Sequence, residues 1–308
     1  MDTQMTKYLC LLVVLFSVGC GSVPESIGPE TTGSQQQAAT CGSCFFFEWA
    51  SNGGPAGSIN STNLTIPTGY GIGQPTQYSH LCAITGITGT FSSTPAPNGS
   101  YEDVNLGFTN NNNIWQVVIQ NGGGLSPNED TQVQVGCVPL PTFAFSGPSF
   151  TQGSFLFPPN PGHTYNRSNY FNGFLSICEV FGSLTTSNDY FLNSPVFGHT
   201  WSGYSSNDAS HRETMNWGTE GLSWSSNPAL TITGPYQVDG STHAVTMPGP
   251  QSAFCALTGL QGLFGDSVAP SSVNMQVINN GTAMQLHNQV NDPHAAYPIA
   301  QAYCVAYH

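Results

Sequence analysis

The chain has 308 residues, of which 6% are charged, whereas roughly a quarter are charged in a typical soluble domain. Lys and Arg together number 3 and Asp and Glu 16, which gives a formal net charge of -13 at pH 7. A charge of this sign repels phosphate backbones and anionic headgroups, so it excludes nucleic-acid binding. The one lysine, Lys7, lies in a segment that we expect to be removed as a leader, so the mature chain would have no lysine for Schiff-base catalysis or a lysine-type phosphate loop.

Residues 1–19 have the pattern of a secretory leader. Lys7 precedes the apolar run "CLLVVLFSVG" (10–19), which is too short to cross a bilayer as a helix. Cys20 follows the run directly, after the small residue Gly19.

The segment "SVGC" (17–20) resembles the lipobox of bacterial lipoproteins, in which the cysteine is acylated after cleavage. The resemblance implies that Cys20 is lipidated and that the exported protein meets the membrane only through this anchor. The resemblance also implies sorting to the outer membrane or cell surface, because the residue after the cysteine is Gly21 and not Asp. Ser17 stands where the family usually has an aliphatic residue, so an ordinary signal peptide on a secreted soluble protein is the alternative.

Residues 20–40 are predicted to form a flexible tether. They are rich in Ser, Gly, Pro, Thr and Gln and have almost no large apolar side chains. Such a segment buries too little apolar surface to offset the entropy of ordering.

One motif is written twice, as "CAITGITGTF" (82–91) and "CALTGLQGLF" (255–264), and a weaker copy, "CEVFGSLTTS", begins at Cys178. All copies place a glycine four residues after the cysteine, at Gly86, Gly182 and Gly259. These glycines are predicted to allow a β-bulge or a close approach of another backbone.

Predicted strands surround the motif. The upstream strands are "CFFFEW" (44–49), "TFAFS" (142–146) and "ALTIT" (229–233). Downstream, "EDVNLGF" (102–108) and "SVNMQVI" (272–278) precede Asn121-Gly122 and Asn280-Gly281, which are predicted hairpin turns.

The closing strands "TQVQVGCV" (131–138) and "AQAYCVAY" (300–307) alternate with period 2. In the first of them, Val133 and Cys137 share the predicted buried face, while Gln132 and Gln134 share the predicted solvent face.

No segment after the leader has sustained helical periodicity. We therefore predict an all-β fold of tandem small antiparallel β-sandwich or half-barrel units, stapled by disulfides. The predicted units are 41–140, a divergent unit at 141–225, and 226–308.

Export predicts that most cysteines pair. The repeat predicts the disulfides Cys82–Cys137 and Cys255–Cys304, each closing one unit. Cys178 has no partner at the matching distance. Either it pairs with Cys41 or Cys44, or "CGSC" (41–44) closes on itself and Cys178 stays a buried thiol.

The divergent unit concentrates aromatic and polar residues between 189 and 224. Aromatic rings stack on pyranose faces while carboxylates, amides and guanidinium groups bind hydroxyls, which predicts a sugar-binding face. The alternative is that bulky aromatics fill the core of a unit without a staple and that the charged residues cap turns. The candidate ligand contacts are His199, Trp201, Tyr204, Asp208, His211, Arg212, Glu213 and Trp217.

No catalytic residue, metal ligand or cofactor is assigned, because the chain has no HExxH, GxSxG or paired CxxC motif. His199 and His211 with Asp208 or Glu213 form a conceivable zinc or acid/base set, which we weigh against hydrogen-bonding surface histidines. The acidic loop "NEDT" (128–131) is a calcium alternative, although it lacks the DxDxDG register.

These observations predict a surface-tethered binding or adhesion protein whose ligand is a carbohydrate or another cell-surface polymer. One alternative is a secreted hydrolase that acts on polysaccharide or peptide with its site in the middle unit. The other is a passive structural surface protein.

Overall fold

The computed structural model describes strands and their connections in the following residues: 37–38, 46–65, 74–76, 79–89, 96–99, 102–109, 114–122, 131–139, 148–156, 165–169, 173–181, 190–196, 200–206, 216–224, 231–261, 271–290 and 297–306. These residues contain β-strands and one short 3-10 turn but no α-helix, so the all-β prediction is confirmed. The leader, Cys20 and most of the tether lie outside the described residues.

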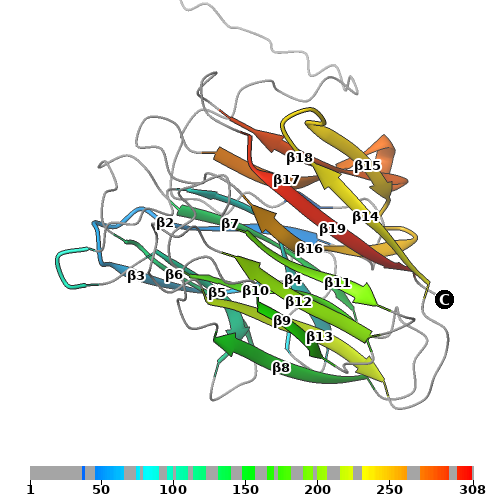
Figure 1. The fold of residues 1–308 in the computed structure, drawn as a ribbon. Helices are drawn as coiled ribbons and strands as arrows, with labels where there is room; N and C mark the ends of the chain where they lie inside the picture. The colour runs from blue at the N-terminus through cyan, green and yellow to red at the C-terminus, as the bar shows by residue number, and fades with distance from the viewer. Residues whose placement is uncertain are drawn as a thin grey trace, which may run out of the picture. The chain divides into compact units, whose positions relative to one another are not determined.

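Each of the three predicted units contributes six strands, and we call these groups of strands the first, second and third modules (Figure 1). A two-residue strand, β1 (Gln37–Ala38), precedes them. The first module consists of β2 (Phe46–Asn52), β3 (Ile59–Asn63), β4 (His80–Gly89), β5 (Asp103–Phe108), β6 (Trp115–Gln120) and β7 (Thr131–Pro139).

The second module consists of β8 (Pro148–Leu156), β9 (Tyr165–Asn169), β10 (Gly173–Phe181), β11 (Tyr190–Val196), β12 (Thr200–Ser206) and β13 (Asn216–Trp224). The third consists of β14 (Ile232–Val238), β15 (Ala244–Pro248), β16 (Ala253–Gln261), β17 (Ser271–Ile278), the 3-10 turn η2 (Asn279–Gly281), β18 (Ala283–Gln289) and β19 (Ile299–Ala306). The unit boundaries near 140 and 225 stay predictions, because the residues around them lie outside the described ranges.

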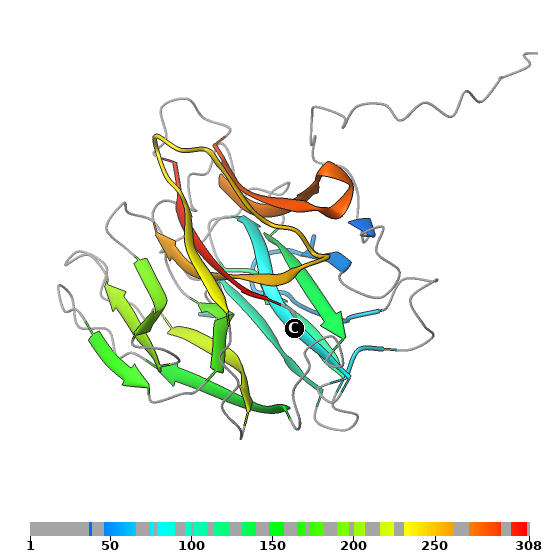
Figure 2. The ribbon, with the colours of Figure 1, turned by 90° about the vertical axis from the view of Figure 1, so that its right-hand side faces the viewer.

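Every module splits its strands between two sheets in the same way. The first, sixth and third strands of a module pair in that order, as in β14-β19-β16, which lie side by side in Figure 1. The second, fifth and fourth strands pair as another group, as in β15-β18-β17. The β17–β18 hairpin of this group is the orange pair in Figure 2.

The modules exchange these halves in a cycle. The third strand of each module pairs with the fourth strand of another, as β4 with β17, β10 with β5, and β16 with β11. Each of the three sheets therefore joins halves of two modules, and the seven-stranded sheet links the third module back to the first. The three motif strands β4, β10 and β16 also contact one another.

Strand register defines equivalent positions in the three modules. At the exchange pairs, Ile87 lies opposite Val273, Val180 opposite Val104, and Leu260 opposite Phe191. Ile87, Val180 and Leu260 are at most 1% exposed, so the same position belongs to the core in all three motif strands. Residues at matching places in the ladders can therefore be compared across modules.

One of the two predicted Asn-Gly turns is confirmed. Asn279, Asn280 and Gly281 have positive φ angles and connect β17 to β18 as a hairpin. The prediction for Asn121-Gly122 was wrong, because β6 and β7 on either side of it belong to different sheets. Instead, the Asn121 side chain donates through Nδ2 to the carbonyls of Asn52 (3.0 Å) and Gly54 (2.7 Å), which anchors the loop.

Candidate functional site

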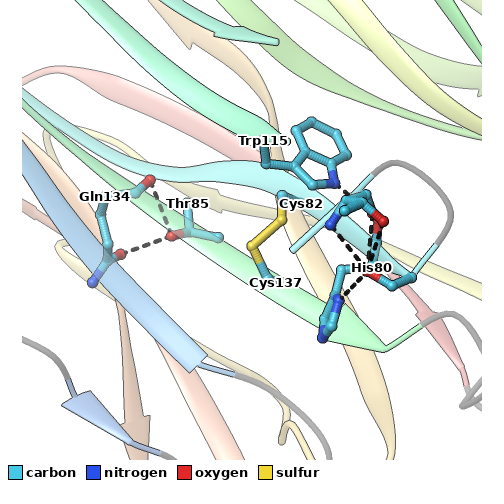
Figure 3. Close-up of a disulfide and its surroundings, with 8 residues drawn as sticks. His80, Cys82, Thr85, Trp115, Gln134 and Cys137 are labelled. Carbon is cyan, nitrogen blue, oxygen red and sulfur yellow. Dashed lines mark hydrogen bonds between the residues drawn. A yellow bond between two sulfur atoms is a disulfide. The ribbon is translucent and has the colours of Figure 1, made fainter. Parts of the chain in front are cut away.

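The repeated motif is a cross-strand staple. Cys82 and Cys137 lie directly opposite each other on β4 and β7, and Cys255 and Cys304 do the same on β16 and β19. Both pairs form disulfides, with Cα–Cα distances of 4.1 and 4.0 Å and sequence separations of 55 and 49 residues. Both predicted disulfides are confirmed (Figure 3 shows the first).

A β-bulge follows each staple. The register of β4 against β7 shifts between Ile84 and Gly86, so Thr85 is the extra residue, and Thr258 is its counterpart on β16. Each threonine hydroxyl donates to the carbonyl opposite the bulge, from Thr85 to Gln134 at 3.3 Å and from Thr258 to Gln301 at 3.4 Å. In these two copies of the motif, the threonine hydroxyl thus bonds across the bulge.

Gly86 lets the third module approach the first. A Cβ atom on Gly86 would lie 2.9 Å from the Val273 carbonyl oxygen and 3.0 Å from the Asn274 Cα, which is too close for any other residue. This confirms the predicted role of the motif glycine at this position.

The solvent-face prediction for Gln134 was wrong. Its side chain is 2% exposed, whereas Gln132 on the same strand is part-exposed. Gln134 is buried because it reaches the neighbouring module: Nε2 donates to the Met275 carbonyl at 3.1 Å, and Oε1 accepts from the Met275 N–H at 3.2 Å. Oε1 also accepts from the Thr85 hydroxyl at 3.0 Å, as Figure 3 shows.

The weak motif copy at Cys178 is offset by three residues from the other two. In β10 the bulge falls between Ile177 and Glu179, so Cys178 occupies the position of Thr85 and Thr258. The residues that correspond to the stapled cysteines are Leu175 and Gly221, which lie opposite each other on β10 and β13. This offset explains why counting from Cys178 finds no partner cysteine.

Of the eight predicted ligand contacts, three lie on described strands, and the register shows what positions they hold. Trp217 pairs with Val180, as Val133 pairs with Ile87. On β12, Ser205 pairs with Phe191, and on β6, Ile119 pairs with Val104. Trp201 and Trp115 each stand four residues before these partners, so they hold equivalent positions. Val133 and Trp115 are fully buried, so both tryptophan positions correspond to core positions of the first module.

Tyr204 holds a different kind of position. It corresponds to Val118 and His287, which are part-exposed on the sheet faces away from the core. Trp201 and Tyr204 lie on β12, whereas Trp217 lies on β13 in another sheet. The other five predicted contacts lie outside the described residues: His199, Asp208, His211, Arg212 and Glu213.

A polar cluster surrounds the start of β4, near the first disulfide (Figure 3). The Ser79 hydroxyl lies 2.9 Å from His80 Nδ1 and accepts from the Thr76 N–H at 2.9 Å. The Trp115 indole donates to the His80 carbonyl at 3.0 Å. Burial lowers the pKa of His80 to about 4, so the imidazole is neutral at pH 7 and orders the strand end.

Glu102, just before β5, is a buried carboxyl that sequence analysis did not single out. Its side chain is 1% exposed, Oε2 accepts from the Gly122 N–H at 2.6 Å, and Oε1 contacts the Thr131 hydroxyl. Burial raises the pKa of Glu102 to about 7, although both hydrogen bonds oppose the shift. Glu102 therefore ties β5 and the end of β6 to β7 in the other sheet.

The outer faces of β6 and β18 share a pattern that sequence analysis also missed. Along β6 the side chains alternate between buried and part-exposed, and the exposed set includes Gln116 and Gln120. Along β18 the exposed set includes Gln285 and Gln289 at the equivalent positions. The sequence signal was the recurrence of glutamines four apart in "WQVVIQ" and "AMQLHNQ".

Comparisons with known proteins find no family model, no curated protein and no solved structure that matches the chain. Within the described ranges, no three His, Cys, Asp or Glu side chains gather where they could hold a metal ion. In the same ranges, no helix has the length and apolar character needed to span a membrane.

Proposed function

We propose that the chain is an exported, surface-tethered binding protein whose ligand is a carbohydrate or another cell-surface polymer. The observation that carries the proposal is the pair of fully buried cross-strand disulfides in a chain with very little charge. Structural disulfides persist in oxidising compartments, which supports export. Exposed strand faces with amide and hydroxyl side chains support a ligand that is rich in hydroxyl groups.

Within this proposal, the binding face predicted in the middle module divides in two. The core-equivalent positions of Trp201 and Trp217 favour a scaffold role for both. Tyr204 and the five residues outside the described ranges, His199, Asp208, His211, Arg212 and Glu213, remain the proposed contacts of that module.

Two measurements test the proposal. Metabolic labelling with a radioactive fatty acid should mark the wild-type chain and should fail with Cys20→Ala. The purified mature chain should be retained by at least one polysaccharide without degrading it. Release of sugars or peptides would favour the hydrolase alternative, and lack of both retention and turnover would favour the passive structural protein.

A further inference from the structure

We propose that the outer faces of β6 and β18 are two register-equivalent docking surfaces for a neutral polysaccharide. This inference rests on the proposed function and names the residues that would make the contact. We call the surfaces the first and third outer faces, after their modules.

The two faces are equivalent by strand pairing. Gln120 lies opposite Asp103, and Gln289 lies opposite Ser272, one residue before the exchange-pair positions Val104 and Val273. Gln116 and Gln285 precede these glutamines by four residues, so each face carries two glutamines at matching places. Residues four apart on a strand point to the same side and are about 13 Å apart.

Neighbouring strands extend each face with small polar side chains. Beside Gln116 on the first face, Asn63 is exposed, and its Oδ1 accepts from Gln116 Nε2 at 2.8 Å. Beside Gln285 on the third face, Thr246 is exposed and Gln276 is part-exposed. Side-chain amides donate and accept hydrogen bonds, as sugar hydroxyls do, so an array of amides is complementary to a polyhydroxyl chain.

Charge selects the kind of polysaccharide. Asp103 is the one Asp, Glu, Lys or Arg on the described strands of the two outer faces. His287, between the two glutamines of the third face, has its pKa lowered by burial and by His243, which favours the neutral imidazole. The faces thus offer no cation to an acidic polymer, and the net charge of -13 repels one.

The second module shows which residue can replace the glutamines of the two outer faces. The positions that correspond to Gln116 and Gln120 are Ser202 and Ser206 on β12. Because this fold already holds serine at these places, replacing the glutamines by serine shortens the contact side chains and is expected to leave the fold unchanged.

The experiment measures retention of the purified mature chain on cellulose, xylan and mannan, with alginate as the acidic polymer. Four chains are compared: wild type, Gln116→Ser with Gln120→Ser, Gln285→Ser with Gln289→Ser, and all four changes together. Gln251→Ala, an exposed glutamine in the turn before β16, is the control. Thermal unfolding checks that each variant is folded.

The wild type and the control should bind a neutral polymer and not alginate. Each double variant should weaken binding about 30-fold, since it removes two side-chain amides and a neutral hydrogen bond is worth roughly 1 kcal/mol. The fourfold variant should weaken it further. Equal binding by wild type and the folded fourfold variant would overturn this inference alone. If no polymer retains the wild type, the proposed function fails as well. His211→Ala and Tyr204→Ala are measured beside these chains, and loss of binding in these two variants alone would move the site to the middle module.

Discussion

Gln134 of the first module brackets the main chain of Met275 in the third, accepting its N–H and donating to its carbonyl. Gln134 lies on β7 and Met275 on β17, and between them stands β4, which pairs with β17 only from Ser271 to Val273. Just beyond that point the Gln134 amide supplies the hydrogen bonds that a continuing strand would have made. One side chain thus joins the first module to the third, through a bond between two residues that are 141 positions apart in the chain.

Replacing Gln134 by Leu should destabilise the whole fold. The change keeps the volume but leaves the buried N–H and carbonyl of Met275 without these partners, and each lost partner costs about 1–3 kcal/mol. Urea denaturation should therefore show a drop of about 2–6 kcal/mol in the free energy of unfolding. Gln132→Leu, at the part-exposed place two residues earlier, is the matched control and should change it by less than about 1 kcal/mol. Equal stability of the two variants would show that the two hydrogen bonds between Gln134 and Met275 do not stabilise the fold.

Removing the first disulfide staple should lower the stability of the protein. The Cys82–Cys137 bond closes a loop of 55 residues, so the entropic account gives a loss of about 4 kcal/mol for the paired Cys82→Ala and Cys137→Ala change. Calorimetry on wild type and the double variant measures it. Cys178→Ala is the comparison, since Cys178 occupies a bulge position instead of a staple position. A drop as large for Cys178→Ala would contradict this assignment.

A third staple should form where the register places it. Leu175 and Gly221 hold the positions of the stapled cysteines, so Leu175→Cys with Gly221→Cys should oxidise to a cross-strand disulfide. Non-reducing peptide mapping identifies the bond. The control, Ser176→Cys with Gly221→Cys, shifts one cysteine to the other side of the strand and should not pair. Pairing in the control but not in the first variant would show that the three modules are not in the same register.

Glu102 should make stability fall as pH rises. Its pKa of about 7 lies above the ordinary value of 4.5, so the folded state binds the proton more tightly than the unfolded chain does. The resulting stability is fully present below pH 4.5 and is lost as pH rises through 7, by roughly 3 kcal/mol in all. Unfolding curves of Glu102→Gln between pH 4 and 8 should lack this loss.

Asp103→Asn, on the neighbouring residue, is the control for Glu102 and should keep the wild-type pH dependence. Because His80 has a pKa lowered to about 4, its contribution runs the other way: it is present above pH 6.5 and is lost as pH falls through 4. The comparison with Glu102→Gln removes this background. The same slope in wild type and Glu102→Gln would refute the assignment.

The sequence predicted the parts of the fold that depend on local pattern. Alternation in 131–138 identified β7, and the spacing of Cys82 and Cys137 identified a bond that closes one module. Both signals are contained within a single repeat. The burial of Gln134 could not be predicted, because its partner is on a strand that only the exchange between modules brings near.

The candidate site was harder to predict for the same reason. A cluster of aromatics in sequence led to Trp201 and Trp217, which stay predicted contacts, and the register adds only their places on β12 and β13. The glutamines of β6 and β18 have a signal in the sequence, yet it becomes visible only when the two modules are aligned by register. Glu102 carries no pattern at all, since its burial depends on Gly122 and Thr131.

The pairing of strands between modules also sets the order in which parts of the chain can fold. Thr88 on β4 bonds to the carbonyl of Ser271, 183 residues further along the chain, so the N-terminal third lacks its neighbour until the C-terminal third has emerged. Topologies with such distant partners fold slowly. A chain built in this way cannot complete its three sheets before the C-terminal segment is available, so folding ends in one late event that closes all three modules.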